Sequence, residues 1–476
     1  MISHAEPLPS PVQRVETQRW YVLAVFSTVS ALNNVVWITF SSVSPSVAAE
    51  YYGIHRRELN QLLNYGPLLF LLVAPFTSWL LTRPSGMRYT VLLGAFLVFA
   101  GSIVRIVPTW AFTEHNRCAG EGRWLLHLGQ ILNALSGPLV ISPVSRLSAL
   151  WFPAEQRAGA TAIAQVANGF GSAVSWFLGP WLASTASGMP HLLYVIAVLT
   201  GLPFVAAVIH FPDRPAVPPT AVPTSSIRSQ VPTVVELNAP LLLSASHADS
   251  HPSARGEPAT TSLAFREGLR QACMNRSFLL LVAAFGMCGV QQAWVAQLQT
   301  LLQGVLGAKA IGVLAVVEAL ACTLCGVACG FIADSKFRRR FKLLIVLALT
   351  ICTLASIHFM LSLSSPFSSR PIFPTNAQMI GVSILIIGST LGTAMPLLFE
   401  LSAELTYPVP EGTSAGVMLW VFNMGCFVLL LVSSYMSVAW INVIWTLTLI
   451  MTTLLMCAVD EQYRRSDAED QIRGTI

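Results

Sequence analysis

The chain has 476 residues, of which 54% are hydrophobic and only 10% are charged, and its formal net charge is +5. Soluble domains carry roughly 25% charged residues, so a water-soluble globular protein is excluded and much of the surface is predicted to face lipid. No basic stretch between the apolar segments is interleaved with aromatic residues, which gives a nucleic-acid partner no support.

The apolar residues gather in twelve segments, each long enough for a helix to cross the hydrocarbon core, which takes roughly 20 residues. The first six are predicted at 20–46, 60–82, 88–112, 125–150, 158–186 and 190–211. The second six are predicted at 278–304, 308–333, 342–364, 376–400, 413–438 and 439–459. The predicted plan is therefore six spans, a polar insert and six further spans.

The insert is rich in Pro, Ser, Thr and Ala and has no sustained apolar period, which predicts a flexible linker. The predicted domains are an N-terminal tail, a six-helix bundle, the linker, a second six-helix bundle and a C-terminal tail, at 1–19, 20–211, 212–273, 274–459 and 460–476. Lys and Arg are concentrated on the side of the N-terminus, most clearly at 336–342. Because basic loops tend to stay in the cytoplasm, both termini are predicted to be cytoplasmic.

Enzymes and metalloproteins carry sequence patterns that this chain lacks. It has no zinc motif, no nucleophile elbow and no phosphate-binding loop. Cys322, Cys325 and Cys329 have a spacing that metal sites use, but they share one apolar segment without further ligands, so we expect small packing residues there. No enzymatic activity, cofactor or metal is predicted.

A short pattern recurs at the ends of the fourth and tenth spans. Arg146 is followed by Leu-Ser-Ala and then by a Pro at 153, and Glu400 is followed by Leu-Ser-Ala and then by a Pro at 408. Each pattern leads into a span that contains an Asn, at Asn168 or Asn423. Parallel repeats of this kind are typical of the major facilitator fold. The sequence therefore predicts an all-α membrane protein with twelve transmembrane helices in two six-helix halves, with the substrate between them.

The tenth span also carries a resemblance to a known family. The segment from Phe399 to Gly412, with Gly129-Gln130 and the Trp-Phe-Pro at 151–153, resembles solute carrier family 49 of the major facilitator superfamily. This family comprises the feline leukaemia virus subgroup C receptor-related transporters, and the resemblance covers most of the chain outside the insert.

Three further features resemble one branch of that family, that of the disrupted in renal carcinoma 2 protein: the Val-Pro-Glu-Gly at 409–412, Asn423 and Trp294. The resemblance implies proton-coupled export of pyridoxine, a form of vitamin B6, from the lysosome, with the plasma membrane as the alternative location. The partners expected are a small-molecule substrate, protons and the lipid bilayer, and the chain is expected to be a monomer.

Two tryptophans are the first candidates for substrate contact. Trp37 and Trp294 lie at similar depths in the first and seventh spans, which are the first helices of the two halves. The resemblance implies that an aromatic at each place grips the substrate. Two aromatic faces can enclose a pyridine ring or hold a cation, so pyridoxine and a choline-like cation both remain open. The structural alternative is that both rings pack inside the helices or lie near an interface.

Amide side chains within the spans are the second set of candidates. Asn423, Asn133 and Asn168 each need a hydrogen-bonding partner in hydrocarbon, which is either a substrate hydroxyl or a neighbouring helix. The resemblance implies a polar residue at the place of Asn423. At Gly137 the choline-carrying relatives have a Gln, so their substrate site does not transfer unchanged.

Charged residues are the candidates for coupling and gating. Glu318 lies in the middle of the eighth span, where a carboxylate costs roughly 2.5–3.5 kcal/mol and protonation largely removes that cost. It is predicted to couple transport to protons, the alternative being a structural pair with Arg105 or His127. Arg146 is predicted to pair with Glu400 when the cytoplasmic side closes, with Glu404 beside it. The alternative is that Arg146 binds lipid phosphates while Glu400 or Glu404 caps a helix.

The predicted function is thus a secondary transporter that works by alternating access. A choline- or ethanolamine-type cation facilitator without proton coupling is the alternative within the same class. A membrane receptor or scaffold that no longer transports is the alternative from another class. A scaffold would tolerate substitution of the inward-facing polar residues, whereas a transporter would not.

Overall fold

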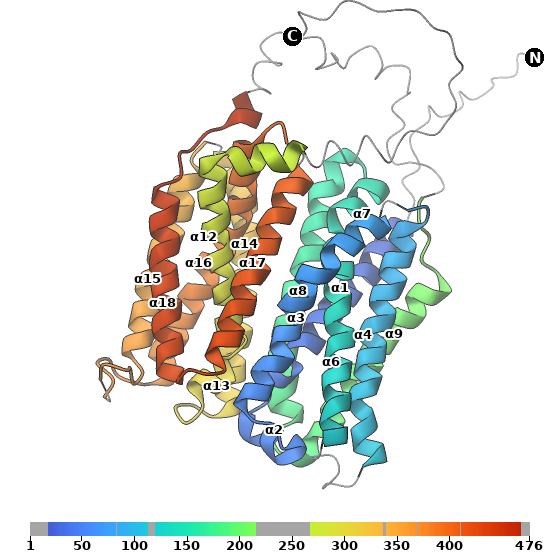
Figure 1. The fold of residues 1–476 in the computed structure, drawn as a ribbon, viewed down its shortest axis with the longest axis vertical. Helices are drawn as coiled ribbons and strands as arrows, with labels where there is room; N and C mark the ends of the chain where they lie inside the picture. The colour runs from blue at the N-terminus through green and yellow to red at the C-terminus, as the bar shows by residue number, and fades with distance from the viewer. Residues whose placement is uncertain are drawn as a thin grey trace, which may run out of the picture.

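The computed structural model describes residues 18–81, 83–112, 120–215, 267–336, 339–368, 370–409 and 411–467. Within these ranges the regular structure is helical, apart from two isolated β-bridges. The long helices stand side by side in two bundles, each built from one half of the chain (Figure 1). Residues 216–266 of the predicted linker and the outer parts of both predicted tails lie outside the described residues, and the end of the predicted linker, at 267–273, is helical.

The described part of the first half contains six long helices and three short ones. The long helices are α1 (Gln18–Ser42), α3 (Arg56–Leu81), α4 (Gly86–Ala111), α6 (Gly120–Ile141), α8 (Ala154–Leu182) and α9 (Met189–Ile209). The short ones are α2 (Pro45–Tyr52), α7 (Val144–Trp151) and η1 (Ala186–Gly188).

The second half repeats this plan. Its long helices are α12 (Arg276–Val295), α14 (Ala308–Lys336), α15 (Phe341–Leu361), α16 (Ala377–Thr406), α17 (Glu411–Ser433) and α18 (Val438–Cys457). The short α13 (Leu298–Leu302) follows α12, and residues 267–274 are helical before it.

Eleven helices among the described residues are long and apolar enough to cross a membrane. The twelfth long helix, α8, is less apolar because it contains Gln165, Asn168 and several glycines, and it packs between α1 of its own half and α14 of the other. The predicted fold of twelve transmembrane helices in two halves is confirmed.

Two predicted spans are interrupted. The fourth, predicted at 125–150, ends as α6 at Ile141 and resumes as α7, because Pro143 has no N–H to donate and begins a new helix instead. The seventh, predicted at 278–304, ends at Val295, and a turn separates it from α13.

Glycines let the helices approach closely. A Cβ atom added at Gly171 of α8 would lie 2.1 Å from the carbonyl oxygen of Ala31 in α1. One added at Gly392 of α16 would lie 2.0 Å from that of Cys322 in α14. The hydrophobic effect does not drive helices together in lipid. Small residues at such crossings stabilise the packing instead, because they allow close van der Waals contact.

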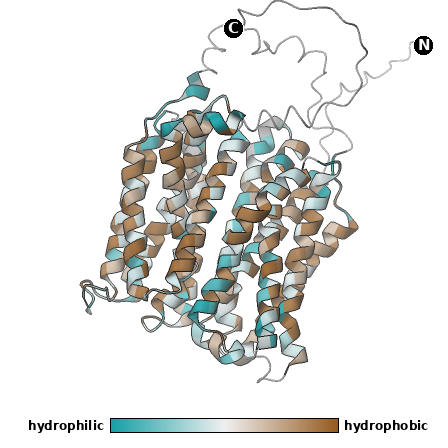
Figure 2. Ribbon diagram, in the orientation of Figure 1, coloured by the Kyte–Doolittle hydropathy of each residue, from teal (hydrophilic) through white to brown (hydrophobic). Residues whose placement is uncertain are grey.

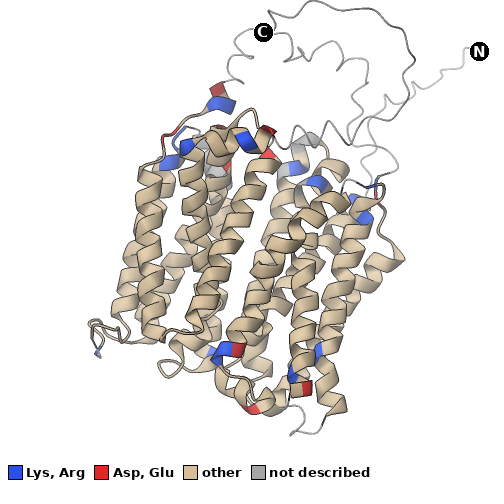
Figure 3. Ribbon diagram, in the orientation of Figure 1, with Lys and Arg blue, Asp and Glu red and all other residues tan. Residues whose placement is uncertain are grey.

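The helices end at two polar faces. We call the end at which α1 begins and α18 ends the terminal face, and the end that carries α2 and α13 the opposite face (Figure 1). Hydrophobic residues dominate the helices between these faces (Figure 2). Lys and Arg lie mostly at the terminal face, and few charged residues lie between the two faces (Figure 3). The chain is therefore a multi-pass integral membrane protein.

Candidate functional site

The two halves meet along two helix pairs, α8 with α14 and α3 with α17. We call this contact the seam. Because the substrate of a two-bundle transporter lies between the bundles, the seam is where the predicted site residues have to be judged.

At the opposite face the seam is held by a partly buried polar contact. Arg56, at the start of α3, donates from Nη2 to the carbonyl oxygens of Ser433 (2.7 Å), the last residue of α17, and of Met436 (2.8 Å), which follows it. One turn later, Asn60 Nδ2 donates to Ser433 Oγ at 3.1 Å. The last carbonyls of a helix have no partner within it and carry partial negative charge, which suits a guanidinium. These residues close the opposite face, although the sequence analysis did not single them out.

A glutamine closes the same face from the other side of the seam. Gln299 of α13 is only 2% exposed. Its Nε2 donates to the carbonyl oxygen of Ser42 at the end of α1 (3.2 Å) and to that of Ala308 at the start of α14 (2.9 Å). The only sequence signal for this contact was a polar residue within the apolar stretch after Trp294.

Further along the seam, Trp420 Nε1 of α17 donates to the carbonyl oxygen of Leu71 in α3 at 3.4 Å.

The predicted pair between Arg146 and Glu400 is absent from this conformation. Glu400 instead pairs with Arg465, which follows α18, at 2.9 Å. Arg465 also pairs with Glu411 at 2.7 Å and with Glu404 at 3.4 Å. The carboxylates predicted for the gate are therefore occupied by a cation of their own half.

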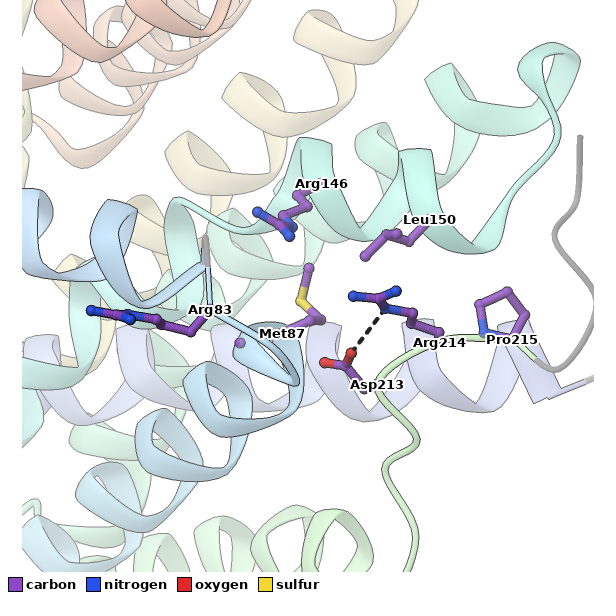
Figure 4. Close-up of a pocket in the computed structure, with 8 residues that line it drawn as sticks. Arg83, Met87, Arg146, Leu150, Asp213, Arg214 and Pro215 are labelled. Carbon is purple, nitrogen blue, oxygen red and sulfur yellow. Dashed lines mark ion pairs between the residues drawn. The ribbon is translucent and has the colours of Figure 1, made fainter. Parts of the chain in front are cut away.

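Arg146 lies at a pocket within the first half. The pocket has a volume of about 260 Å³ (Figure 4) and is lined by Arg83, Gly86, Met87, Arg146, Leu150, Asp213, Arg214 and Pro215. Asp213 Oδ2 pairs with Arg214 Nε at 3.3 Å, and Asp213 Oδ1 accepts a hydrogen bond from the backbone N–H of Arg88 at 3.1 Å. This aspartate, which follows α9, stabilises the start of α4. All the lining residues belong to one half, so the pocket is separate from the seam.

Trp37 lies on α1, beside α3. Its ring is partly exposed, and it packs against an apolar cluster that contains residues of both halves. Trp37 Nε1 donates to the carbonyl oxygen of Leu63 in α3 at 2.9 Å, and the ring lies over Gly66, where a Cβ would come within 2.5 Å of Nε1. These contacts hold the tryptophan in one orientation.

A buried arginine supports this stretch of α1. Arg105 of α4 is fully buried and donates from Nη1 to the carbonyl oxygen of Val36 and to Gln130 Oε1, both at 3.1 Å. Gln130 Nε2 donates to the carbonyl oxygen of Trp37 at 3.2 Å. The pair therefore fixes two consecutive carbonyls of α1 at the tryptophan.

Trp294 does not face Trp37. It is fully buried, stacks on Trp445 of α18 with ring centroids 3.8 Å apart, and meets Phe359 of α15 edge-on. Its Nε1 donates to Asn442 Oδ1 at 3.0 Å, which satisfies an amide within the bundle. The two rings predicted to enclose the substrate are not paired in this structure, because Trp294 is turned into its own half.

Two of the three predicted asparagines join helices of the first half. Asn133 Nδ2 donates to the carbonyl oxygen of Asn33 at 3.2 Å. Asn168 Nδ2 donates to Ser30 at its carbonyl oxygen (3.0 Å) and its Oγ (3.1 Å). Asn423 is different, because its Nδ2 bonds only within α17, to the carbonyl oxygen of Leu419 at 2.9 Å, and the residue is partly exposed. Asn423 therefore joins no neighbouring helix through its amide donor, unlike the other two.

Glu318 is 6% exposed and lies on α14 where it crosses α16. The crossing is close, because a Cβ at Gly388 would lie 2.6 Å from the carbonyl oxygen of Glu318. Within the described ranges no ion pair joins Glu318 to a cation. The two partners considered from the sequence are engaged elsewhere: Arg105 with Gln130, and His127 with the Tyr65 hydroxyl at 3.1 Å.

Comparison with known proteins places this architecture among transporters. The family model of the Major Facilitator Superfamily matches residues 25–430. The fold is similar to that of a D-xylose-proton symporter, with a TM-score of 0.66, 11% identity and coverage of 94% of this chain and 99% of that one.

Curated relatives have similar sequences over nearly the whole chain. A solute carrier family 49 member 4 homolog from Xenopus laevis is 29% identical, covering 91% of this chain and 89% of the relative. The choline/ethanolamine transporter FLVCR1 from Felis catus is 27% identical, covering 87% of this chain and 67% of the relative. Solute carrier family 49 member A3 from Danio rerio is 27% identical over 85% of this chain and 75% of the relative. The resemblance to solute carrier family 49 that was inferred from the sequence is confirmed.

Proposed function

Because the chain belongs to the major facilitator superfamily and is a secondary transporter of the solute carrier family 49 type, we propose that it couples the export of pyridoxine from the lysosome to the movement of protons. The solute passes through the seam by alternating access. The observation that carries this proposal is the contact through which Arg56 ties the start of α3 to the end of α17 across the seam at the opposite face. Contacts that exist in one state only are what a two-state transporter needs.

Trp37 is the proposed substrate platform. Its ring is partly exposed, and its indole N–H is already bound to the carbonyl oxygen of Leu63, so a ligand would meet the ring rather than the N–H. A pyridine ring stacks on the face of such an indole. Asn423, whose amide bonds only within its own helix, is the proposed partner for a substrate hydroxyl. Trp294, Asn133 and Asn168 support the site by packing or by joining helices.

Glu318 is the proposed proton carrier. A carboxyl group that is buried within a span without a cation partner is stable mainly in its protonated form. Movement of α14 against α16 would change its access to water, so that it takes up a proton in one state and releases it in the other. The close crossing at Gly388 places the backbone of Glu318 against α16, the helix that carries Glu400.

The terminal face is proposed to be cytoplasmic, because Lys and Arg gather there (Figure 3). The structure then corresponds to a state that is closed to the lumen by Arg56, Asn60 and Gln299. In the alternate state the terminal face closes, and Arg146 meets Glu400 across the seam.

A second candidate is a choline- or ethanolamine-type facilitator. It is favoured by the choline/ethanolamine transporter among the relatives, and by the partly exposed aromatic ring of Trp37, because such a ring can hold a quaternary ammonium group by its charge. A facilitator of this kind needs no proton carrier, so Glu318 distinguishes the two candidates.

The test is an uptake panel with the purified chain in proteoliposomes, using labelled pyridoxine, choline and ethanolamine at two pH values. We expect pyridoxine uptake that depends on the pH gradient and falls at least tenfold in Trp37→Ala but less in Trp37→Phe. Uptake of choline without pH dependence would favour the second candidate. Absence of uptake of all three would favour a receptor or scaffold.

A further inference from the structure

The residues that follow α18 form a strap across the second half. We define the strap as residues 460–467. Its first residues attach to the starts of two helices: the N–H of Asp460 donates to Ser277 Oγ in α12 (3.2 Å), and Glu461 Oε1 accepts from the N–H of Lys342 in α15 (2.8 Å). The Tyr463 hydroxyl accepts from the N–H of Phe341 at 2.9 Å. The strap therefore follows the terminal face rather than leaving it.

The strap ends in a dense ionic cluster with α16 and α17. Arg465 binds three carboxylates, those of Glu400, Glu404 and Glu411. Burial lowers the pKa of Arg465, but hydrogen bonds to Glu400 and Glu411 outweigh burial, and the pKa lies above its usual range. The guanidinium is therefore charged at every physiological pH.

Ser466 lies at the centre of this cluster. It is 7% exposed, and its Oγ donates to Glu404 Oε1 at 2.7 Å while its N–H donates to Glu404 Oε2 at 3.1 Å. Glu404 is itself 1% exposed. A negative group at Ser466 would therefore face a buried carboxylate with no room for water between them.

The sequence around this serine is the second observation. Acidic residues follow Ser466 at the first, third and fourth positions, as Asp467, Glu469 and Asp470. Serine with acids at these positions is the pattern that acidophilic serine/threonine kinases select. Nothing in the transport mechanism requires this pattern.

We propose that Ser466 is a phosphorylation site, and that its phosphorylation releases the strap from Glu400. In the reaction, Ser466 Oγ forms a bond to the γ-phosphorus of ATP and the bond between that phosphorus and the β,γ-bridging oxygen breaks. ADP leaves, and the hydroxyl proton passes to the base of the kinase. The phosphoserine carries a charge of roughly −1.5 to −2. The Glu404 carboxylate repels this charge, so the phosphorylated residue leaves the position that the serine occupied.

The consequence concerns the gate, and here the inference rests on the proposed function. While the strap is docked, Arg465 holds Glu400 and competes with Arg146 for it. After release Glu400 is free to meet Arg146, so closure of the terminal face is favoured. The strap thus favours the state seen here, and phosphorylation shifts the protein towards the other state.

Ser466 is buried while docked, so a kinase can reach it only when the strap opens locally. This gives a test on the purified full-length chain that does not depend on transport. The chain is incubated with ATP and an acidophilic serine/threonine kinase, and the extent of labelling at Ser466 is measured by mass spectrometry. Arg465→Ala breaks the cluster and is expected to raise the initial labelling rate at least fivefold. Arg464→Ala is the control, because Arg464 contacts only Gln462 within the strap.

Release is measured by trypsin cleavage after Arg464 and Arg465. Phosphorylated chain and the Ser466→Glu variant are expected to be cut there at least tenfold faster than unmodified chain, and Ser466→Ala at nearly the unmodified rate. Absence of labelling at Ser466 in both the parent and Arg465→Ala would contradict the proposal that Ser466 is a phosphorylation site. Labelling at Ser466 without faster trypsin cleavage would contradict the proposal that phosphorylation releases the strap. Neither result bears on the substrate, so failure of the proposed function is measured separately, by the uptake panel.

Discussion

Removing the Arg56 side chain should open the opposite face. Its guanidinium makes two bonds to carbonyls at and just after the end of α17, at 2.7 Å and 2.8 Å. Hydrogen bonds to charged groups contribute about 1.5–3 kcal/mol each when buried. Arg56 is partly exposed and water replaces part of the loss, so we take about 2 kcal/mol for the pair, which corresponds to a roughly 30-fold shift between the two states.

The shift can be followed by double electron–electron resonance. Spin labels at Glu50→Cys, in α2, and Val305→Cys, after α13, report the separation of the two halves at the opposite face, with Cys118, Cys273 and Cys457 replaced by serine. Glu50 and Val305 are both exposed. We expect a short distance in the parent and a dominant longer component in Arg56→Ala. Arg56→Lys should fall between them, because an ammonium group cannot form the same fork.

The neighbouring arginine provides the control. Arg57 Nη2 donates to the Tyr435 hydroxyl at 2.8 Å and its guanidinium lies over the same ring, but it is exposed and meets no helix end. Exposed contacts contribute about 0–1 kcal/mol, so Arg57→Ala should change the distances much less. An Arg56→Ala distribution identical to that of the parent would refute the view that this residue holds the face closed.

Three further predictions follow from the seam and its charges. Trp37→Ala should lower transport with little change in melting temperature, whereas Trp294→Ala should lower the melting temperature, because it removes the face on which Trp445 stacks; equal thermal effects would contradict the assignment. Glu318→Gln should flatten the pH dependence of uptake while substrate exchange persists, and an unchanged pH profile would reduce the residue to a structural role. Arg146→Glu should impair transport and the added change Glu400→Arg should partly restore it; a double variant as inactive as the two losses combined would contradict the proposed gate.

The fold could be predicted because it depends on length and polarity. A run of apolar residues long enough to cross a bilayer leaves the backbone few options other than a helix. The repeated pattern at Arg146 and Glu400 gave the relation between the two halves. Two predicted spans were wrong in detail, because each is divided into two helices. Pro143 divides the fourth span, and the chain turns after Val295 in the seventh.

The orientation of side chains around a helix could not be predicted from depth. Trp37 and Trp294 lie at similar depths, but a helix advances by about 100° per residue, so depth does not decide which neighbour a ring meets. The core of the second half, with Asn442 and Trp445, determines the direction of Trp294. The direction of Trp294 could be predicted only by knowing which faces of α15 and α18 pack against α12.

The ionic contacts were missed for a different reason. The repeat pairs Arg146 with Glu400 by symmetry, but Arg465 comes from the segment after α18, which lies outside the repeated pattern. Arg56 at the start of a span resembles an ordinary solvated charge in the sequence. Its role depends on the end of α17, 377 residues further along the chain.

The most direct test of the account is to measure whether protons move with pyridoxine. The purified chain is reconstituted in liposomes that enclose an impermeant pH indicator, and unlabelled pyridoxine is added outside in weak buffer without an initial pH gradient. We predict a change of internal pH on addition of pyridoxine that is absent in empty liposomes and strongly reduced in Glu318→Gln. Pyridoxine uptake at the same rate with no change of internal pH would contradict the proton-coupled mechanism.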